Sequence, residues 1–354
     1  IPEGFLAIGK SAKGFSFGAF LVVVVLGLVL GSCIGRSPVA AEGDVVFAAE
    51  IDGALSDSKL TGNSDIFSLN ESGEDVLRLT TDGDRDFSPS WSPEKNAIAF
   101  ISERNGYSAL WIMDIDGKSK KQISPPGEIV TNFEWAPNSD RIVVEIQKDG
   151  SHWLGLIDLE SDTFSALTLQ DQNLKIGGWS PDGEWIVYFS ADSGIQGIRR
   201  SNINGVQEID VTTGSDSNPQ WSPDGRFIAF NRLDEADAMN LFVIDIKGKN
   251  PVNLAPDGFD KTQFEWAPDS KRIVFVGDST GNAEIYTIEP DGDKLKKLTA
   301  NRVTDAAPHW SRDGKFILFI SEGAGSFSLY TMDSKDGNKQ KRITLTPDIF
   351  ESDW

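Results

Sequence analysis

Few residues in this sequence are of a type that carries out nucleophilic or metal chemistry. The 354 residues include one cysteine, Cys33, and two histidines, His152 and His309. A single cysteine excludes an intrachain disulfide and a thiolate metal cluster. Two isolated histidines make a poor metal site. We therefore expect no metal ion and no cofactor, and we interpret both histidines as structural or solvent-facing.

One segment matches a nucleophile motif. Residues 277–281 read GDSTG and fit G-x-S-x-G, in which a sharp strand-to-helix turn exposes a serine that works with a later acid and histidine. Ser279, however, lies between two strand-like segments, RIVFVGD and EIYTIEP, and the only later histidine directly precedes a repeated tryptophan. We interpret the motif as a hairpin turn, so no catalytic set is predicted.

The cysteine ends an apolar N-terminal segment. Residues 14–35 carry no charge and follow Lys13, a pattern typical of a secretory signal or a membrane helix with its basic end in the cytoplasm. The sequence LGSC up to Cys33 resembles the lipobox of bacterial lipoproteins, which implies lipidation of that cysteine. The alternative is an uncleaved transmembrane helix. Either way, residues 1–33 are a signal peptide or anchor, residues 34–43 are a linker, and residues 44–354 are extracytoplasmic.

The charge of the chain argues against nucleic-acid binding. With 33 Lys and Arg against 54 Asp and Glu, the net charge is −21. Such a surface repels phosphate backbones and anionic lipid headgroups. Solubility is a sufficient explanation for the charge.

A repeat of 42 to 45 residues runs through the chain. It is marked by a Trp in patterns such as NPQWSPDGRFIAF (218–230) and APHWSRDGKFILF (307–319). The repeated tryptophans are Trp91, Trp135, Trp179, Trp221, Trp266 and Trp310, and Trp354 follows at the same spacing.

Each repeat predicts four short strands. In the copy that begins at Asp305, DAAPHW, KFILFIS, SLYTMDS and QKRITLT are separated by the turns SRDG and KDGN, which have the Asp-Gly composition of tight hairpins. Four antiparallel strands per repeat of this length indicate the blade of a β-propeller. We therefore expect an all-β fold preceded by an N-terminal apolar helix.

The two ends of the repeat region complement each other. Residues 43–50, 64–70 and 75–80 read as the second, third and fourth strands of a blade that lacks its first strand, whereas DIFESDW at the C-terminus reads as a first strand alone. Joined, they make a composite blade beside six others. The sequence therefore predicts a seven-bladed ring closed by pairing of the C-terminal strand with the N-terminal blade, which leaves no open sheet edge.

The run W-S-P-D-G-x-x-I-A-F, followed by L/I-Y-x-M/I-D, D-G and L-T, resembles the TolB-type, WD-repeat-like propeller repeat over residues 44–354. The resemblance implies the propeller fold, but proteins with this repeat include TolB, envelope proteins, oligogalacturonate lyases and the propellers of prolyl oligopeptidases. TolB itself has a further α/β domain and six blades, so the likeness is one of repeat only. The repeat that contains Arg199 and Arg200 departs from the pattern, and we read that pair as an exposed edge or as an anion contact.

A position five residues before the repeated Trp carries Asp86, Asp216 and Asp305. In the family this position is often Asp near the axial opening. The three residues either cap turns by accepting backbone N–H groups or form an acidic rim that attracts a cation.

We expect a lipid- or membrane-anchored binding or scaffolding module of the cell envelope, with a protein, peptide or glycan at one face of the propeller and no enzymatic activity. Two alternatives remain: a polysaccharide lyase or other glycan-processing enzyme acting at the axial pocket, and the sensor part of a larger membrane protein.

Overall fold

The computed structural model describes residues 45–50, 64–69, 76–94, 96–148, 150–168, 173–190, 197–205, 207–234, 238–254, 263–278, 282–323, 326–342 and 351–352. The predicted apolar helix, Cys33 and the linker lie outside this part of the chain, as do Ser279 and Trp354. Within the described residues, no helix has the length and apolar character needed to cross a membrane.

Every described element is a strand, and the strands form four-stranded antiparallel sheets. Six sheets are built from four consecutive strands each, and each sheet is named here by its first strand.

The first strands are β4 (Asp86–Trp91), β8 (Ile129–Trp135), β12 (Leu174–Trp179), β16 (Asp216–Trp221), β20 (Phe264–Trp266) and β24 (Asp305–Trp310). The second strands are β5 (Ala97–Ser102), β9 (Arg141–Lys148), β13 (Trp185–Ser190), β17 (Phe227–Leu233), β21 (Ile273–Asp278) and β25 (Phe316–Gly323). The third strands are β6 (Ala109–Asp114), β10 (Ser151–Asp158), β14 (Ile198–Asn202), β18 (Met239–Asp245), β22 (Ala283–Ile288) and β26 (Ser326–Asp333). The fourth strands are β7 (Lys121–Gln122), β11 (Thr163–Ala166), β15 (Glu208–Asp210), β19 (Val252–Asn253), β23 (Lys296–Lys297) and β27 (Lys341–Arg342).

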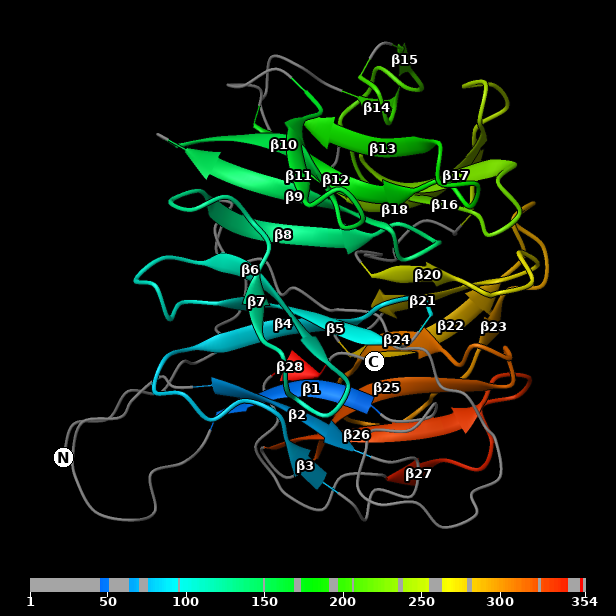
Figure 1. Cartoon of the computed structure of the whole chain (residues 1–354). Helices are drawn as coiled ribbons and strands as arrows, with labels where there is room; N and C mark the ends of the chain where they lie inside the picture. The colour runs from blue at the N-terminus through cyan, green and yellow to red at the C-terminus, as the bar shows by residue number, and fades with distance from the viewer. Residues whose placement is uncertain are drawn as a thin grey trace, which may run out of the picture.

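The sheets are arranged as the blades of a propeller. Figure 1 shows the first strands β4, β8, β12, β16, β20 and β24 around a common centre, with outer strands such as β15, β23 and β27 at the periphery. First strands of neighbouring sheets contact each other, as β8 does with β12 and β20 with β24. The predicted all-β propeller of four-stranded antiparallel sheets is confirmed.

A further four-stranded sheet joins the two ends of the described chain. Its strand order is β28 (Glu351–Ser352), β1 (Val45–Glu50), β2 (Ser64–Leu69) and β3 (Val76–Arg78). β28 pairs antiparallel with β1, with Ser352 opposite Phe47 and Glu351 opposite Ala48. The first-strand position of this composite sheet is therefore filled by the C-terminal segment.

The core lies between sheets and not within one layer. One cluster of buried side chains combines Val46 and Ile66 of the composite sheet with Ile98 and Phe100 of the β4 sheet. Another combines residues of the β4 sheet with those of the β8 sheet. Alternate residues of a strand point to opposite faces, so a sheet between two neighbours needs apolar residues on both faces. This requirement explains the continuous apolar runs that the sequence shows in the second strands.

The repeated tryptophans link adjacent first strands. The indole Nε1 of Trp135 donates to the carbonyl of Ser90 at 3.3 Å, and that of Trp179 donates to the carbonyl of Glu134 at 3.1 Å. In each pair the acceptor belongs to the residue just before the Trp of the preceding sheet. A buried indole N–H needs such a partner, because leaving it without one costs free energy. The repeat of the Trp is thus explained by both packing and hydrogen bonding.

The SPDG turns explain how the first and second strands are joined. Ser222 donates its hydroxyl to Asp224 at 2.7 Å, and Asp224 in turn accepts the backbone N–H of Arg226. Gly225 has φ of +71°, which favours glycine because a Cβ is disfavoured in this region. These turns set the two strands in register beneath the next Trp.

Candidate functional site

The residues directly before the repeated tryptophans lie on the first strands, which surround the common centre of the propeller (Figure 1). Gln220 donates to the carbonyl of Phe264, and Glu265 meets His309, so both of these side chains reach the first strand of the next sheet. The set consists of Ser90, Glu134, Gly178, Gln220, Glu265 and His309. It brings two carboxylates and one imidazole to the strands nearest the propeller axis.

Glu265 and His309 form a bonded pair across two first strands. The Nδ1 atom of His309 lies 3.0 Å from Oε2 of Glu265, and the same oxygen accepts the backbone N–H of Trp310 at 3.1 Å. His309 is 6% exposed, and its Nε2 is buried without a hydrogen-bond partner among the described residues. The carboxylate orients the imidazole, as a positioning group does in many sites.

Glu134 occupies the same position as Glu265 but lacks such a neighbour. The next first strand has Gly178 where His309 stands, and no hydrogen bond to the Glu134 carboxylate is formed among the described residues. Gly178 has φ of +133° and lies at a register shift of β12, and a Cβ at this position would meet no atom within 4 Å. Glu134 therefore lies on the strand next to a small open space.

The surroundings of Glu134 change its acidity. Its side chain keeps exposed surface, yet it is so closely enclosed by protein that burial alone raises its pKa from 4.5 to about 7. A carboxyl group with a strongly raised pKa and accessible surface is a candidate for function.

The same glycine explains an irregularity in the core. Trp221 follows Gly178 in the series, and its indole Nε1 is buried without a partner among the described residues. The corresponding indole of Trp266 donates to the carbonyl of Gln220 at 3.4 Å, and that of Trp310 to the carbonyl of Glu265 at 3.3 Å. The indole of Trp221 thus lacks the hydrogen bond of its counterparts at the place where Gly178 leaves open space beside Glu134.

Two of the predicted rim residues are buried in ion pairs. Arg104 reaches both oxygens of Asp86 at 3.1 Å. Arg232 binds Asp216 through Nε at 2.5 Å and Nη2 at 2.8 Å. The side chains of both aspartates are fully buried. Arg232 binds through two nitrogens and Arg104 through Nη2 alone, and each guanidinium neutralises its carboxylate where it stands.

The third rim residue, Asp305, is also buried, but no arginine pairs with it among the described residues. It accepts the hydroxyl of Ser321 at 2.5 Å and the side-chain amide of Asn301 at 2.7 Å, and burial raises its pKa. The structure thus corrects the acidic-rim hypothesis, because none of the three carboxylates is presented to solvent. The turn-capping alternative is not observed either, because the partners are side chains.

A polar cluster that the sequence did not suggest links the β8 and β12 sheets. Nζ of Lys175 lies 3.1 Å from Oε2 of Glu145 and 3.2 Å from Nδ1 of His152. Glu145 also accepts the backbone N–H of Ile176 at 2.8 Å. Burial, and then the Lys175 charge, lowers the pKa of His152. A neutral His152 that accepts from the ammonium suits a structural link between blades.

The described residues form neither a nucleophile elbow at the GDSTG segment nor a metal site. The strands that flank the GDSTG segment pair as a hairpin, with Asp278 opposite Ala283, so the segment does not lead from a strand to a helix. Among the described residues, no group of three or more His, Cys, Asp or Glu is arranged to hold a metal ion.

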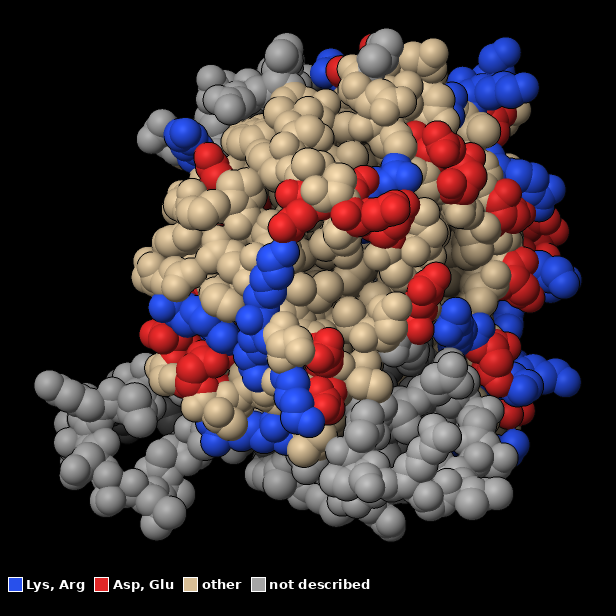
Figure 2. All heavy atoms as spheres, viewed as in Figure 1, with Lys and Arg blue, Asp and Glu red and all other residues tan. Residues whose placement is uncertain are grey.

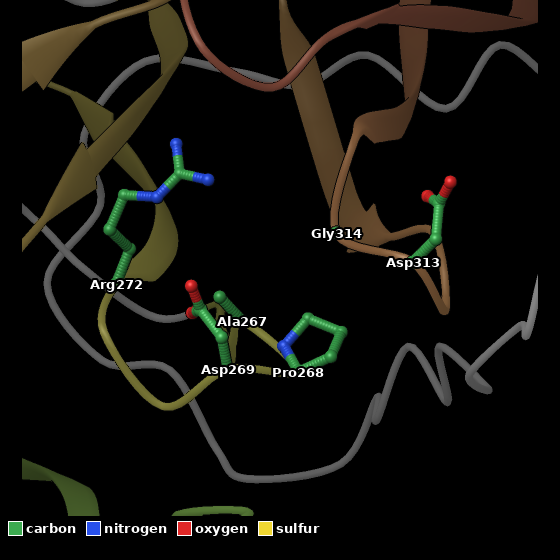
Figure 3. A pocket seen from close by; sticks show the side chains of 6 residues that line it. All are labelled: Ala267, Pro268, Asp269, Arg272, Asp313 and Gly314. Atoms are coloured by element: carbon green, nitrogen blue, oxygen red, sulfur yellow. The ribbon is translucent and has the colours of Figure 1, made fainter.

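A pocket of about 240 Å³ lies among the turns at one end of the sheets (Figure 3), lined by Ala267, Pro268, Asp269, Arg272, Asp313 and Gly314. Arg272 donates to the carbonyl of Ser334 at 2.9 Å and stacks on Trp310 at 4.7 Å. The side chains of Arg272 and Asp313 do not point toward one another (Figure 3). The polar groups here support turns and do not converge on a ligand.

The surface in the view of Figure 2 carries both signs of charge. A line of Lys and Arg side chains crosses this face next to acidic side chains. Several of the basic residues in the β4 sheet are paired, as Lys118 is with Asp116 and Lys121 with Asp162, both at 2.8 Å. The net charge of −21 is therefore not spread as a uniform field.

Glu134 and Glu265 could have been found from the repeat itself. Both stand in the triplet Phe-Glu-Trp, directly before the Trp. The prediction considered only the position five residues before the Trp. The sequence does not reveal that their neighbours differ, because that depends on which side chain the next first strand places opposite them.

The fold and the inner side chains define a β-propeller. More particularly, the chain belongs to the family of the TolB β-propeller domain, whose model matches residues 54–215 and 179–351.

Individual relatives are distant. A stretch of 137 residues is 27% identical to dipeptidyl-peptidase 5 of Porphyromonas gingivalis, which is 34% of this chain and 20% of that protein. The chain thus matches only about a fifth of that relative's length. Among solved structures, puromycin hydrolase superposes with a TM-score of 0.68 at 13% identity, over 86% of this chain and 52% of that chain. An oligogalacturonate lyase in complex with manganese gives 0.62 at 17% identity, over 80% and 82%. These structures share the fold.

Proposed function

We propose that this propeller is an extracytoplasmic binding module that receives a cationic group of a protein or peptide at its axis. The observation that carries the proposal is the unpaired, enclosed and accessible carboxylate of Glu134 next to the open space at Gly178. A cation placed there would gain an attraction that water screens poorly, because the site is enclosed. It would also replace the hydrogen-bond partners that the carboxylate lacks.

A pH-dependent binding experiment tests this role. A fluorescent tetralysine peptide should bind the parent more tightly at pH 8 than at pH 6, because the carboxyl is ionised only above its pKa of about 7. Glu134→Gln should weaken binding about fivefold or more at pH 8 and remove most of the pH dependence. Glu160→Gln, which removes the same charge from an exposed turn, is the control. Equal binding and equal pH dependence in all three proteins would reject the axial site.

The module is proposed to work at the cell envelope, held by a lipid on Cys33 or by the uncleaved N-terminal segment. The basic flank, the apolar run and the LGSC sequence support this placement.

We further propose that the composite sheet serves as a seventh blade and closes the ring. Pairing of β28 with β1 and packing of that sheet against the β4 sheet support this. Deletion of residues 348–354 should then lower Tm by 5 °C or more, roughly, or cause aggregation, because it opens a sheet edge. A truncated protein that melts within a degree or two of the parent would contradict closure.

The alternative of a glycan-processing enzyme is supported by the fold shared with an oligogalacturonate lyase and by the Glu265–His309 pair. Elimination or hydrolysis of an oligosaccharide by the parent, lost in His309→Gln and retained in His152→Gln, would favour the enzyme over the binding module.

A further inference from the structure

Arg200 stands where the other blades have an apolar residue or a threonine. On β14 it lies opposite Val187 of β13, on the face that turns to the β16 sheet. The residues at the corresponding register position in the other continuous sheets are Ile112, Leu156, Val243, Thr287 and Thr331. A guanidinium at the edge of an interblade interface is therefore a departure that packing does not require.

The guanidinium is desolvated without a counter-charge. It stacks on Trp185 at 4.6 Å, and its Nε is buried without a hydrogen-bond partner among the described residues. Burial alone lowers its pKa, with no contribution from a nearby carboxylate. Of the guanidinium nitrogens only Nε is both fully buried and without a partner, so the two Nη atoms are left to pair end-on with a ligand.

Two other arginines that stack on aromatic rings have carboxylate acceptors, whereas Arg85, which stacks on Phe87, is itself exposed. Arg104 stacks on Trp111 at 4.4 Å and pairs with Asp86. Arg232 stacks on Phe242 at 4.9 Å and pairs with Asp216. A partly buried arginine without such a partner is unexpected in a chain with 54 acidic and 33 basic residues.

The nearest carboxylates are committed to the opposite face of the sheet. Arg199, next in the chain, points to that face because successive side chains alternate. It binds Glu208 at 2.9 Å and Asp210 at 3.1 Å. The edge strand β15 therefore presents Ile209, opposite Arg200, on the face of interest, and Ile209 is 38% exposed.

We propose that Arg200, Ile209 and the outer edge of β15 bind an extended peptide through a peptide carboxylate. The guanidinium would donate through its two Nη atoms to both oxygens of the carboxylate, and Ile209 would contact an apolar side chain of the peptide. Among the described strands, none pairs with the outer edge of β15, so this edge offers backbone groups for strand addition. This site lies on the outer strand, apart from the axial set that includes Glu134.

The ligand is a peptide and not an acidic sugar. Sugars commonly use an aromatic ring as a stacking platform, but the face of Trp185 is already covered by the guanidinium. An unpaired strand edge beside an exposed aliphatic side chain matches the repeating groups of an extended chain.

Three N-acetylated, fluorescent pentapeptides of valine and threonine test the proposal on the intact chain. The first has a free C-terminal carboxylate, the second is amidated, and the third is amidated with a central glutamate. We expect the parent to bind one of the two acidic peptides at least about tenfold more tightly than the neutral one, which also identifies the source of the carboxylate. Arg200→Gln should abolish this preference. Arg199→Gln, on the opposite face, should keep it.

Folding of both variants is checked by Tm, and Arg200→Met, which keeps the stack on Trp185, serves as a second variant without charge. It should lose the preference while retaining the parent's Tm within about 2 °C. Equal affinities for the three peptides, failure of the parent to bind any of them, or equal losses in the two glutamine variants would overturn the proposal. So would displacement of the acidic peptide by an oligogalacturonate that binds more tightly.

Discussion

The carboxyl group of Glu134 should make the protein less stable as the pH rises. In the folded protein its pKa is raised to about 7, whereas the unfolded chain has the ordinary value of 4.5. Below pH 4.5 the group is protonated in both states and burial costs nothing. Between these values the folded state keeps its proton, and above pH 7 the charge must be held in an enclosed site. The stability associated with the neutral form is therefore lost as the pH rises through both values.

The magnitude follows from the difference between these pKa values. If enclosure acted alone, a pKa raised from 4.5 to about 7 would correspond to about 3 kcal/mol above pH 8. Because the side chain also keeps exposed surface, solvent screens part of this cost, and we expect about 1–2 kcal/mol. Replacing Glu134 by Gln removes the charge and keeps the shape. The variant should gain about 2–5 °C in Tm above pH 8.

The assay is thermal and urea unfolding of the parent and Glu134→Gln from pH 5.5 to 8.5. The lower limit stays above the pI of about 4.5, where precipitation interferes. The advantage of the variant should be smaller at pH 5.5 than at pH 7, increase across this interval and level off above about pH 7.5. Glu160→Gln at an exposed turn should show no such growth. An advantage of Glu134→Gln that is constant with pH, or that shrinks as the pH rises, would refute the reasoning.

Three further substitutions have predicted effects on stability or on lipid labelling. Asp216→Asn should cost about 2–4 kcal/mol in urea unfolding, since Arg232 loses the charge that balances it, and the cost should shrink in an Arg232→Met background. Gly197→Ala should lower the free energy of unfolding by about 2 kcal/mol or more, because φ is +102° and the new Cβ would lie 2.1 Å from the carbonyl oxygen of Thr212. Gly106→Ala, where φ is also positive but the new Cβ would meet no atom within 4 Å, should lower it by about 1 kcal/mol. A Gly197→Ala protein as stable as the Gly106→Ala protein would contradict this. Cys33→Ser should abolish palmitate labelling of the chain, and equal labelling of parent and variant would reject lipidation.

Much of the fold follows from local pattern. The Trp spacing, the SPDG turns and the apolar second strands predict four antiparallel strands per repeat, because each of these signals acts within a few residues of the chain. The position of the GDSTG segment between two strand-like runs likewise predicts a hairpin, and the two strands pair as one. Such features need no knowledge of neighbouring blades.

The site could not be read in the same way. Asp86, Asp216 and Asp305 are alike in sequence, but only the fold puts an arginine against two of them and Ser321 and Asn301 against the third. Their burial and these partners leave neither the acidic rim nor the turn caps that the sequence left open. Whether a carboxylate is available depends on its surroundings, and those come from other strands.

The sequence by itself therefore determined the propeller and its repeat, since the hydrophobic period and turn chemistry are local. The tertiary structure alone decided which groups have partners. Glu134 and Glu265 share one position in the repeat, yet the next first strand offers Gly178 to one and His309 to the other. Arg199 and Arg200 are adjacent, yet only one meets carboxylates. Some partners lie on a neighbouring blade, as His309 does for Glu265, and others lie on another strand of the same blade, as Arg232 does for Asp216. Neither kind of contact follows from local sequence pattern.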